Sequence, residues 1–215
     1  HGSFRRGDAT SARRSLGLGD ETVLLSVGRV QPLKGLDLAI RACAELRDRS
    51  GRAPLLVVVG GASGGSGRDH LRRLEALIAA LGLDDRVRFV GPQPHSSLPE
   101  YYRAADALLM CSYSESFGLA ALEAHACGVP VVATDVGGLR HIVRDGTSGF
   151  LVDGRDPAAF AERLGVLLER PELWKTFSSA AQRSAASFEW DAAATSMLEL
   201  YDCLVEERVP QLCTC

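Results

Sequence analysis

The chain has 215 residues, of which 46% are hydrophobic and 24% are charged, and its formal net charge is −3. This length can bury a sizeable core as one large or two small domains, and the charge gives no reason to expect nucleic acid or a membrane surface as partner. The sequence as given has no apolar run near 18 residues and no signal-peptide pattern, so we expect a soluble, cytoplasmic protein. Six cysteines without framework spacing suit reduced thiols in that compartment.

The chain is expected to fall into three parts. Residues 1–15 are polar and have no apolar period, which predicts a linker from a missing N-terminal domain. Residues 16–187 carry a regular alternation of apolar runs and helical patterns. Residues 188–215 are predicted to form a C-terminal helix and tail. No initiator methionine begins the sequence, and we therefore expect a fragment.

Short apolar strands alternate with helices from Thr22 onward. The predicted strands cover 23–27, 55–59, 87–90, 107–110, 131–133 and 149–152. The predicted helices cover 35–49, 68–81, 97–105, 117–127, 139–144, 157–168, 172–187 and 190–207. Strands bounded by glycine that alternate with helices of about 10–15 residues indicate a doubly wound α/β domain, whose parallel sheet is covered on both faces.

Ligands of such sheets bind outside the carboxyl ends of the strands, so the loops after the strands are the candidate sites. The loop after the first strand runs from Gly28 to Gly35 and holds two cations, Arg29 and Lys34. Two fixed cations at this edge suit a diphosphate, which carries about two negative charges. A solvated loop is the alternative for an isolated Lys-Gly pair, but the full string and the other loops favour a binding site.

The next two loops are less specific. Residues 60–67, beginning with Gly60, form a glycine-rich loop that lacks both the G-x-G-x-x-G and the P-loop patterns. It could lie against a ligand or be a flexible surface loop. After the third strand, prolines flank Gln93, whose main chain could face a planar base, although a simple turn also explains them. His95 is expected to be a surface residue before a helix cap at Ser96 or Ser97.

Polar residues cluster at a predicted helix start after the fourth strand. Ser116 stands where an N-cap is expected, and the backbone N–H groups of residues 117–119 are then free to bind phosphate oxygens. Gly118 would let a ligand approach the backbone closely. Glu115 and Glu123 could accept hydrogen bonds from sugar hydroxyls. Acids also occur at helix N-termini without any ligand, and this alternative stays open for each of them.

These motifs together resemble a known family. The E-x7-E spacing from Glu115 to Glu123, followed by A-C-G-V-P-V-V-A, is similar to the signature of the retaining glycosyltransferases of family 4. G-R-V-Q-P-L-K-G resembles that family's G-R-L-x-x-x-K-G loop, and residues 136–152 and 188–201 resemble its following segments. The resemblance covers about residues 15–205, essentially the whole chain.

The resemblance implies a GT-B fold, in which two Rossmann-like domains enclose the active site, and this chain corresponds to the C-terminal, donor-binding half. Arg29, Lys34 and Glu115 would be catalytic: the cations would neutralise the donor's diphosphate and the acid would bind the transferred sugar. Glu123 would bind the ribose, and the main chain at Gln93 the base. The implied donor-binding residues are Gly28, Arg29, Lys34, Gly60, Gln93, Glu115, Ser116, Phe117, Gly118, Leu119 and Glu123.

The implied reaction is transfer of a hexosyl group from a nucleoside diphosphate sugar, UDP-linked in our expectation, to a hydroxyl of a small-molecule or glycan acceptor with retention. No D-x-D is present, which fits an enzyme that needs no metal or other cofactor. The missing half would bind the acceptor and could contact a membrane peripherally. The alternatives are a nucleotide-sugar-binding module without activity and a sugar-nucleotide epimerase. A dehydrogenase is disfavoured, because the glycine-rich loop lacks the G-x-G-x-x-G pattern of dinucleotide-binding proteins.

Overall fold

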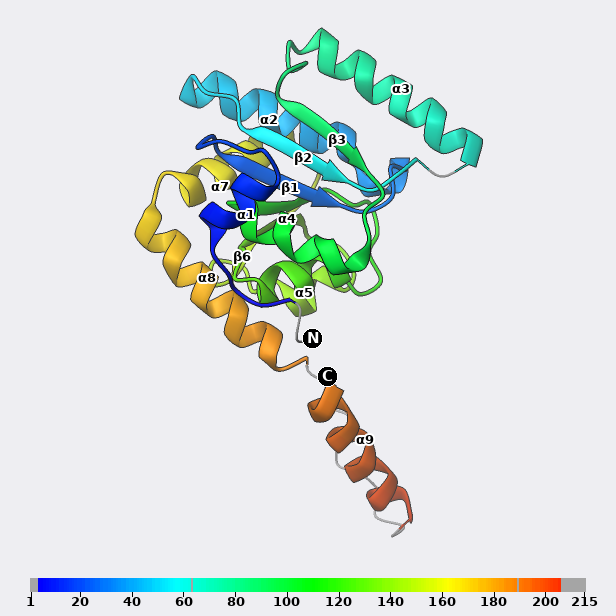
Figure 1. The fold of residues 1–215 in the computed structure, drawn as a ribbon. Helices are drawn as coiled ribbons and strands as arrows, with labels where there is room; N and C mark the ends of the chain where they lie inside the picture. The colour runs from blue at the N-terminus through cyan, green and yellow to red at the C-terminus, as the bar shows by residue number, and fades with distance from the viewer. Residues whose placement is uncertain (1–3, 63, 189, 206–215) are drawn as a thin grey trace.

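A six-stranded parallel sheet forms the centre of the domain, with the strand order β3-β2-β1-β4-β5-β6 (Figure 1). The computed structural model describes residues 4–62, 64–188 and 190–205. Its strands are β1 (Val23–Val27), β2 (Leu55–Val59), β3 (Val87–Gly91), β4 (Ala107–Met110), β5 (Val131–Thr134) and β6 (Gly149–Val152). β1 pairs with both β2 and β4, so the order reverses between β1 and β4.

Helices connect consecutive strands and continue beyond the sheet. They are α1 (Ala9–Ser15), α2 (Leu36–Ser50), α3 (Gly64–Ala80), α4 (Leu98–Ala104), α5 (Leu119–Ala126), α6 (Leu139–Ile142), α7 (Pro157–Leu168), α8 (Pro171–Ala186) and α9 (Trp190–Val205). Two short 3-10 turns, η1 (Pro32–Lys34) and η2 (His95–Ser97), precede α2 and α4.

The sheet separates two hydrophobic cores because successive side chains of a strand point to opposite faces. Leu24 contributes to the core beneath α2, α3 and α7, whereas Leu25 contributes to the core beneath α4, α5 and α6. β2 and β4 are buried along their whole length, as expected for strands covered on both sides. The predicted doubly wound α/β fold is confirmed.

Most element boundaries agree with the sequence analysis. β1, β2, β4 and β6 have the predicted ends, and β3 and β5 are each one residue longer. α7 also has the predicted ends, and Asp156 caps it by accepting a hydrogen bond from the Ala158 amide at 3.0 Å. α3 begins at Gly64, so half of the predicted glycine-rich loop is helical.

The N-terminal segment differs from the expected linker. Residues 9–15 form α1, capped by the side chain of Asp8. Arg13 fixes this helix to the domain through an ion pair with Asp106 at 2.7 Å and a hydrogen bond to the Ala104 carbonyl. Phe4 is buried against the core beneath α4. The charged and polar contacts of Arg13 help to hold the segment, and such contacts leave no apolar period in the sequence.

The C-terminal helix α9 extends away from the sheet (Figure 1). Five of its described apolar side chains are exposed, namely those of Met197, Leu198, Leu200, Tyr201 and Leu204. Residues 206–215, with Cys213 and Cys215, lie outside the described residues. In the described part of the chain, no helix is both long and apolar enough to cross a membrane.

His125, on the buried face of α5, makes the folding stability depend on pH. His125 is fully buried, and this burial lowers its pKa from 6.5 to about 4. The unfolded chain therefore binds a proton below pH 6.5 that the folded chain does not bind until about pH 4. We expect this group to remove about 2 kcal/mol of folding stability between pH 7.5 and pH 5.

Urea denaturation at both pH values tests this expectation. His125→Leu should lose about 2 kcal/mol less stability on acidification than the wild type, because leucine does not titrate. His141→Leu is the matched control, since His141 is exposed on α6. Equal pH dependence in the wild type and His125→Leu would contradict the assignment.

Candidate functional site

The candidate site lies where the strand order of the sheet reverses. The loops after β1 and β4 leave the same edge of the sheet side by side, because β4 is the parallel neighbour of β1. A backbone hydrogen bond from the Tyr113 amide to the Leu33 carbonyl joins the two loops at 2.9 Å. Such a reversal at the carboxyl edge is the usual ligand position in open α/β sheets.

A glycine makes the close approach of these two loops possible. Gly35 has φ +63°, and a Cβ atom there would collide with the Cys111 carbonyl oxygen. Arg155 donates a hydrogen bond to the same carbonyl at 3.1 Å, and its guanidinium lies 3.3 Å from the centre of the Tyr113 ring. Any larger residue at position 35 would therefore separate the two loops.

The contact between the loops brings Lys34 and Glu115 together. Lys34 Nζ donates to Glu115 Oε2 at 2.7 Å, and both side chains are partly buried. The predicted site thus contains an ion pair between two residues to which the sequence analysis assigned separate roles. Lys34 also lines a narrow crevice with Gly28 and Arg29. The Arg29 side chain is exposed beside this crevice.

The helix after β4 starts later than expected. α5 begins at Leu119 with Gly118 as its N-cap, so the prediction that Ser116 caps it is wrong. Gly118 has φ +95° and leaves no room for a Cβ beside the Leu139 side chain. The loop instead meets the start of α6, where the Gly138 amide donates to the Glu115 carbonyl at 2.8 Å. These backbone contacts fix the Glu115 main chain independently of a side-chain cap.

The second predicted acid has two partners that the sequence did not reveal. Glu123 Oε2 accepts a hydrogen bond from the Tyr102 hydroxyl at 2.7 Å, and Glu123 Oε1 lies 3.0 Å from His95 Nε2. His95 is on the surface, as predicted, but it contacts this acid. Ser97 makes no side-chain cap for α4; its hydroxyl bonds the Pro94 carbonyl. Tyr102 lies on α4, the helix that precedes α5, and it belongs to no sequence motif that could have identified it.

Backbone bonds hold the loops after β2 and β3 near the same edge. The Gly60 amide donates to the Gly91 carbonyl, and the Gly61 carbonyl accepts from the Val30 amide. A Cβ at Gly60, where φ is +141°, would collide with the Gly28 carbonyl. Gln93 is partly buried, and its side-chain amide reaches the Val90 carbonyl at 3.5 Å. The predicted residues of these loops therefore share an edge with the loop that carries Lys34.

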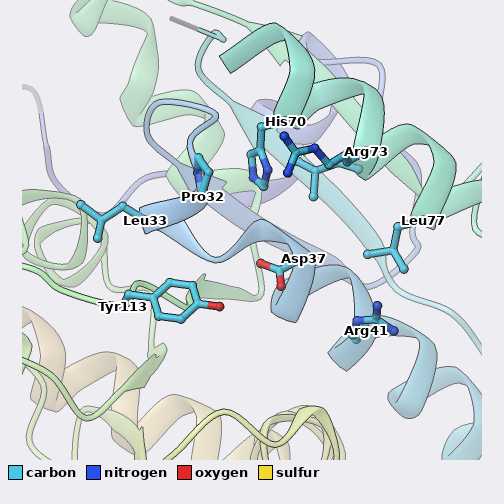
Figure 2. Close-up of a pocket in the computed structure, with 9 residues that line it drawn as sticks. Pro32, Leu33, Asp37, Arg41, His70, Arg73, Leu77 and Tyr113 are labelled. Carbon is cyan, nitrogen blue, oxygen red and sulfur yellow. The ribbon is translucent and has the colours of Figure 1, made fainter. Parts of the chain in front are cut away.

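A larger cavity of about 660 Å³ lies beside η1, between α2 and α3. Figure 2 shows His70 and Arg73 of α3 above Asp37 and Arg41 of α2, with Leu33 and Tyr113 toward the sheet edge. Burial lowers the pKa of His70, which favours its neutral form. Pro32 and Leu33 of η1 line this cavity, whereas Lys34 of the same turn lines the crevice. Among the described residues, no group of three or more His, Cys, Asp and Glu side chains could hold a metal ion.

Solved structures define the class of the fold. The chain superposes on sucrose-phosphate synthase from Thermosynechococcus elongatus with a TM-score of 0.84 and 35% identity, over 95% of this chain and 50% of that one. HepE from Anabaena, solved in complex with UDP-glucose, gives a TM-score of 0.82 and 28% identity, over 95% of this chain and 55% of that one. The chain has the fold of the C-terminal domain of a GT-B glycosyltransferase.

The family follows from the sequence. Residues 8–184 match the family model described as glycosyl transferases group 1, and the chain belongs to this family. It is similar to D-inositol 3-phosphate glycosyltransferase of Geodermatophilus obscurus, with 49% identity over 207 residues, which are 95% of this chain and 45% of that protein. The chain spans about half the length of the curated relatives that it matches.

The geometry of Gly35 yields a stability prediction. Gly35→Ala is expected to destabilise the fold by about 3 kcal/mol, because it combines left-handed strain with a backbone collision that must move η1. Gly51→Ala is the matched control: Gly51 has φ +73° but open space around its Cβ position. It should lose only about 1–2 kcal/mol. Urea denaturation measures both, and equal losses would contradict the role of the contact at position 35.

Proposed function

We propose that this chain is the donor-binding half of a retaining glycosyltransferase of family 4. The enzyme transfers a hexosyl group from a nucleoside diphosphate sugar, UDP-linked, to a hydroxyl acceptor. The observation that carries this proposal is the ion pair of Lys34 with Glu115 at the switch point of the sheet, beside the exposed Arg29. The UDP-glucose complex of the similar protein HepE supports the choice of donor.

Charge stabilisation of the leaving group is the role of the two cations. When the bond between the anomeric carbon and the donor phosphate oxygen breaks, its electron pair stays on the diphosphate. Arg29 and Lys34 are placed to stabilise this charge, together with backbone N–H groups at the start of α5. This requires Lys34 to exchange Glu115 for the diphosphate, and Glu115 is then free to accept a hydrogen bond from a sugar hydroxyl.

The other predicted donor contacts follow the same edge. Glu123 binds the ribose, and the main chain around Gln93 binds the base. Gly28 and Gly60 allow the backbone to approach the donor, and residues 116–119 supply main-chain donors to the phosphate and the sugar. No metal or other cofactor is required in this scheme, because the cations are side chains.

The acceptor belongs to the half of the protein that this chain does not span. Relatives named D-inositol 3-phosphate glycosyltransferase support an inositol phosphate as acceptor. The N-terminal half would bind this acceptor, face the donor site and provide any peripheral membrane contact. The enzyme is then cytoplasmic, where nucleotide sugars are available.

A binding module without activity is the second candidate, because the chain spans only about half of its relatives. Sugar transfer by the 215-residue chain, measured beside a full-length relative, distinguishes the two. Turnover by the chain alone would exclude a binding-only role. Donor consumption without acceptor that yields an epimer would instead indicate a sugar-nucleotide epimerase.

Thermal shift with UDP, GDP and ADP tests the donor site. A ligand at 100 times its Kd stabilises the folded state by about 2.7 kcal/mol, and we expect the largest shift with UDP. Lys34→Ala and Glu123→Ala should each remove most of that shift, because they delete the contacts to the diphosphate and the ribose.

Lys175→Ala is the matched control for the loss of a lysine. Lys175 lies on α8 and is exposed, and its partner within the described part of the chain is Glu172 of the same helix. This variant should keep the wild-type UDP shift. An unchanged shift in both site variants would refute the site assignment.

A further inference from the structure

Glu123 is held by two partners of very different mobility. Tyr102 donates its hydroxyl to Oε2 from a fully buried position, whereas the His95 ring contacts Oε1 from a side chain that is 72% exposed. The Glu123 side chain itself is only 19% exposed. One carboxylate oxygen therefore faces the protein interior, and the other faces a residue at the surface.

The Tyr102 contact is anchored in the core. Burial, and next the negative charge of Glu123, raise the pKa of Tyr102 well above its ordinary value, so its hydroxyl keeps the proton that it donates. The ring belongs to the core beneath α4 and contacts Phe4 edge-on, with 5.9 Å between the centroids. A hydrogen bond to a carboxylate from a fixed donor fixes the direction of that carboxylate as well.

The His95 contact is exchangeable. His95 lies on the short turn η2, and apart from Glu123 its described ring contact is with Phe4, at 4.9 Å between the ring centroids. Exposed contacts between a histidine and a carboxylate stabilise a fold weakly, since water competes for both groups. A hydroxyl that approaches Glu123 Oε1 can therefore displace the ring at little cost.

We propose that Tyr102 is a positioning residue that aims Glu123 Oε1 at a ribose hydroxyl of the donor, and that His95 occupies this oxygen only until the donor binds. The inference rests on the proposed function, in which Glu123 binds the ribose. It gives roles in donor binding to two residues that the sequence did not place in the site. It also assigns opposite effects to them: Tyr102 supports donor binding, and His95 competes with it.

The test measures recognition of the ribose by calorimetry on the 215-residue chain. UDP, GDP and ADP are titrated first, followed by the 2′-deoxy and 3′-deoxy forms of the diphosphate that binds tightest. Tyr102→Phe keeps the buried ring and removes only the hydroxyl. We expect its Kd for the parent diphosphate to rise about tenfold, because Glu123 loses its alignment. One of the two deoxy diphosphates should bind the wild type more weakly than the parent does. For that ligand, the Kd of Tyr102→Phe should equal the Kd of the wild type.

Tyr101→Phe is the matched control, because Tyr101 is the neighbouring, half-buried tyrosine of α4. It should bind all the ligands as the wild type does. His95→Ala removes an exposed side chain and should tighten binding of the parent diphosphate about threefold, with no change for the deoxy form. The folding of Tyr102→Phe is checked by its thermal melting without ligand, and His95→Ala tests the competitor role of His95 independently of that variant.

The outcomes distinguish a failure of the proposed function from a failure of the roles assigned to Tyr102 and His95. A wild-type chain that binds none of the three diphosphates overturns the proposed function and this inference with it. A wild-type chain that binds, while Tyr102→Phe weakens the parent and deoxy forms equally or not at all, overturns the positioning role alone. Weaker binding by His95→Ala would make His95 a donor ligand and overturn its role as a competitor.

Discussion

The arrangement of the candidate site depends on the backbone contact between Gly35 and the Cys111 carbonyl. This contact joins the loops after β1 and β4 at the point where the sheet reverses its strand order. It leaves no space for a side chain, and Arg155 reinforces it by bonding the same carbonyl. The short distance between Lys34 and Glu115 follows from it, since the two side chains extend from adjoining positions in the two loops.

The acids of the site have partners within the protein before any ligand binds. Glu115 pairs with Lys34, and Glu123 is shared between Tyr102 and His95. A partly buried ion pair contributes little net stability, because the loss of hydration offsets most of the attraction. A ligand with both an anionic group and hydroxyls can replace Glu115 at Lys34 and His95 at Glu123, while Tyr102 keeps its hydrogen bond. These contacts therefore pair the charged side chains when no ligand is bound, and their exchange for ligand contacts costs little free energy.

The fold was largely predictable from the sequence, because burial on both faces makes the inner strands continuous apolar runs. β2 and β4 show this most clearly, and their predicted ends are confirmed. The start of α5 was not predictable in the same way. Serine is favoured as an N-cap, but the packing of the loop against Gly138 places the cap at Gly118. That packing comes from a distant segment.

The candidate site was predictable only in part, for a similar reason. The sequence placed Lys34 and Glu115 at one edge, since the loops after parallel strands meet there, but it did not indicate their ion pair. Tyr102 and His95 contact Glu123 across 21 and 28 residues. Both separations join different elements, α4 and η2 to α5, so no period within one helix or strand indicates these contacts. The segment before β1 was missed because Arg13 holds it by charge and hydrogen bonds.

The sheet order also determines when this site can exist during synthesis. Lys34 and Glu115 are 81 positions apart, and β2 and β3 are made between them although neither separates β1 from β4 in the sheet. A nascent chain that has completed β3 carries the cations of the site without their acids, and the edge of β1 is still open for β4. The candidate site is thus a property of the finished sheet, and a chain released before β4 has paired does not contain it.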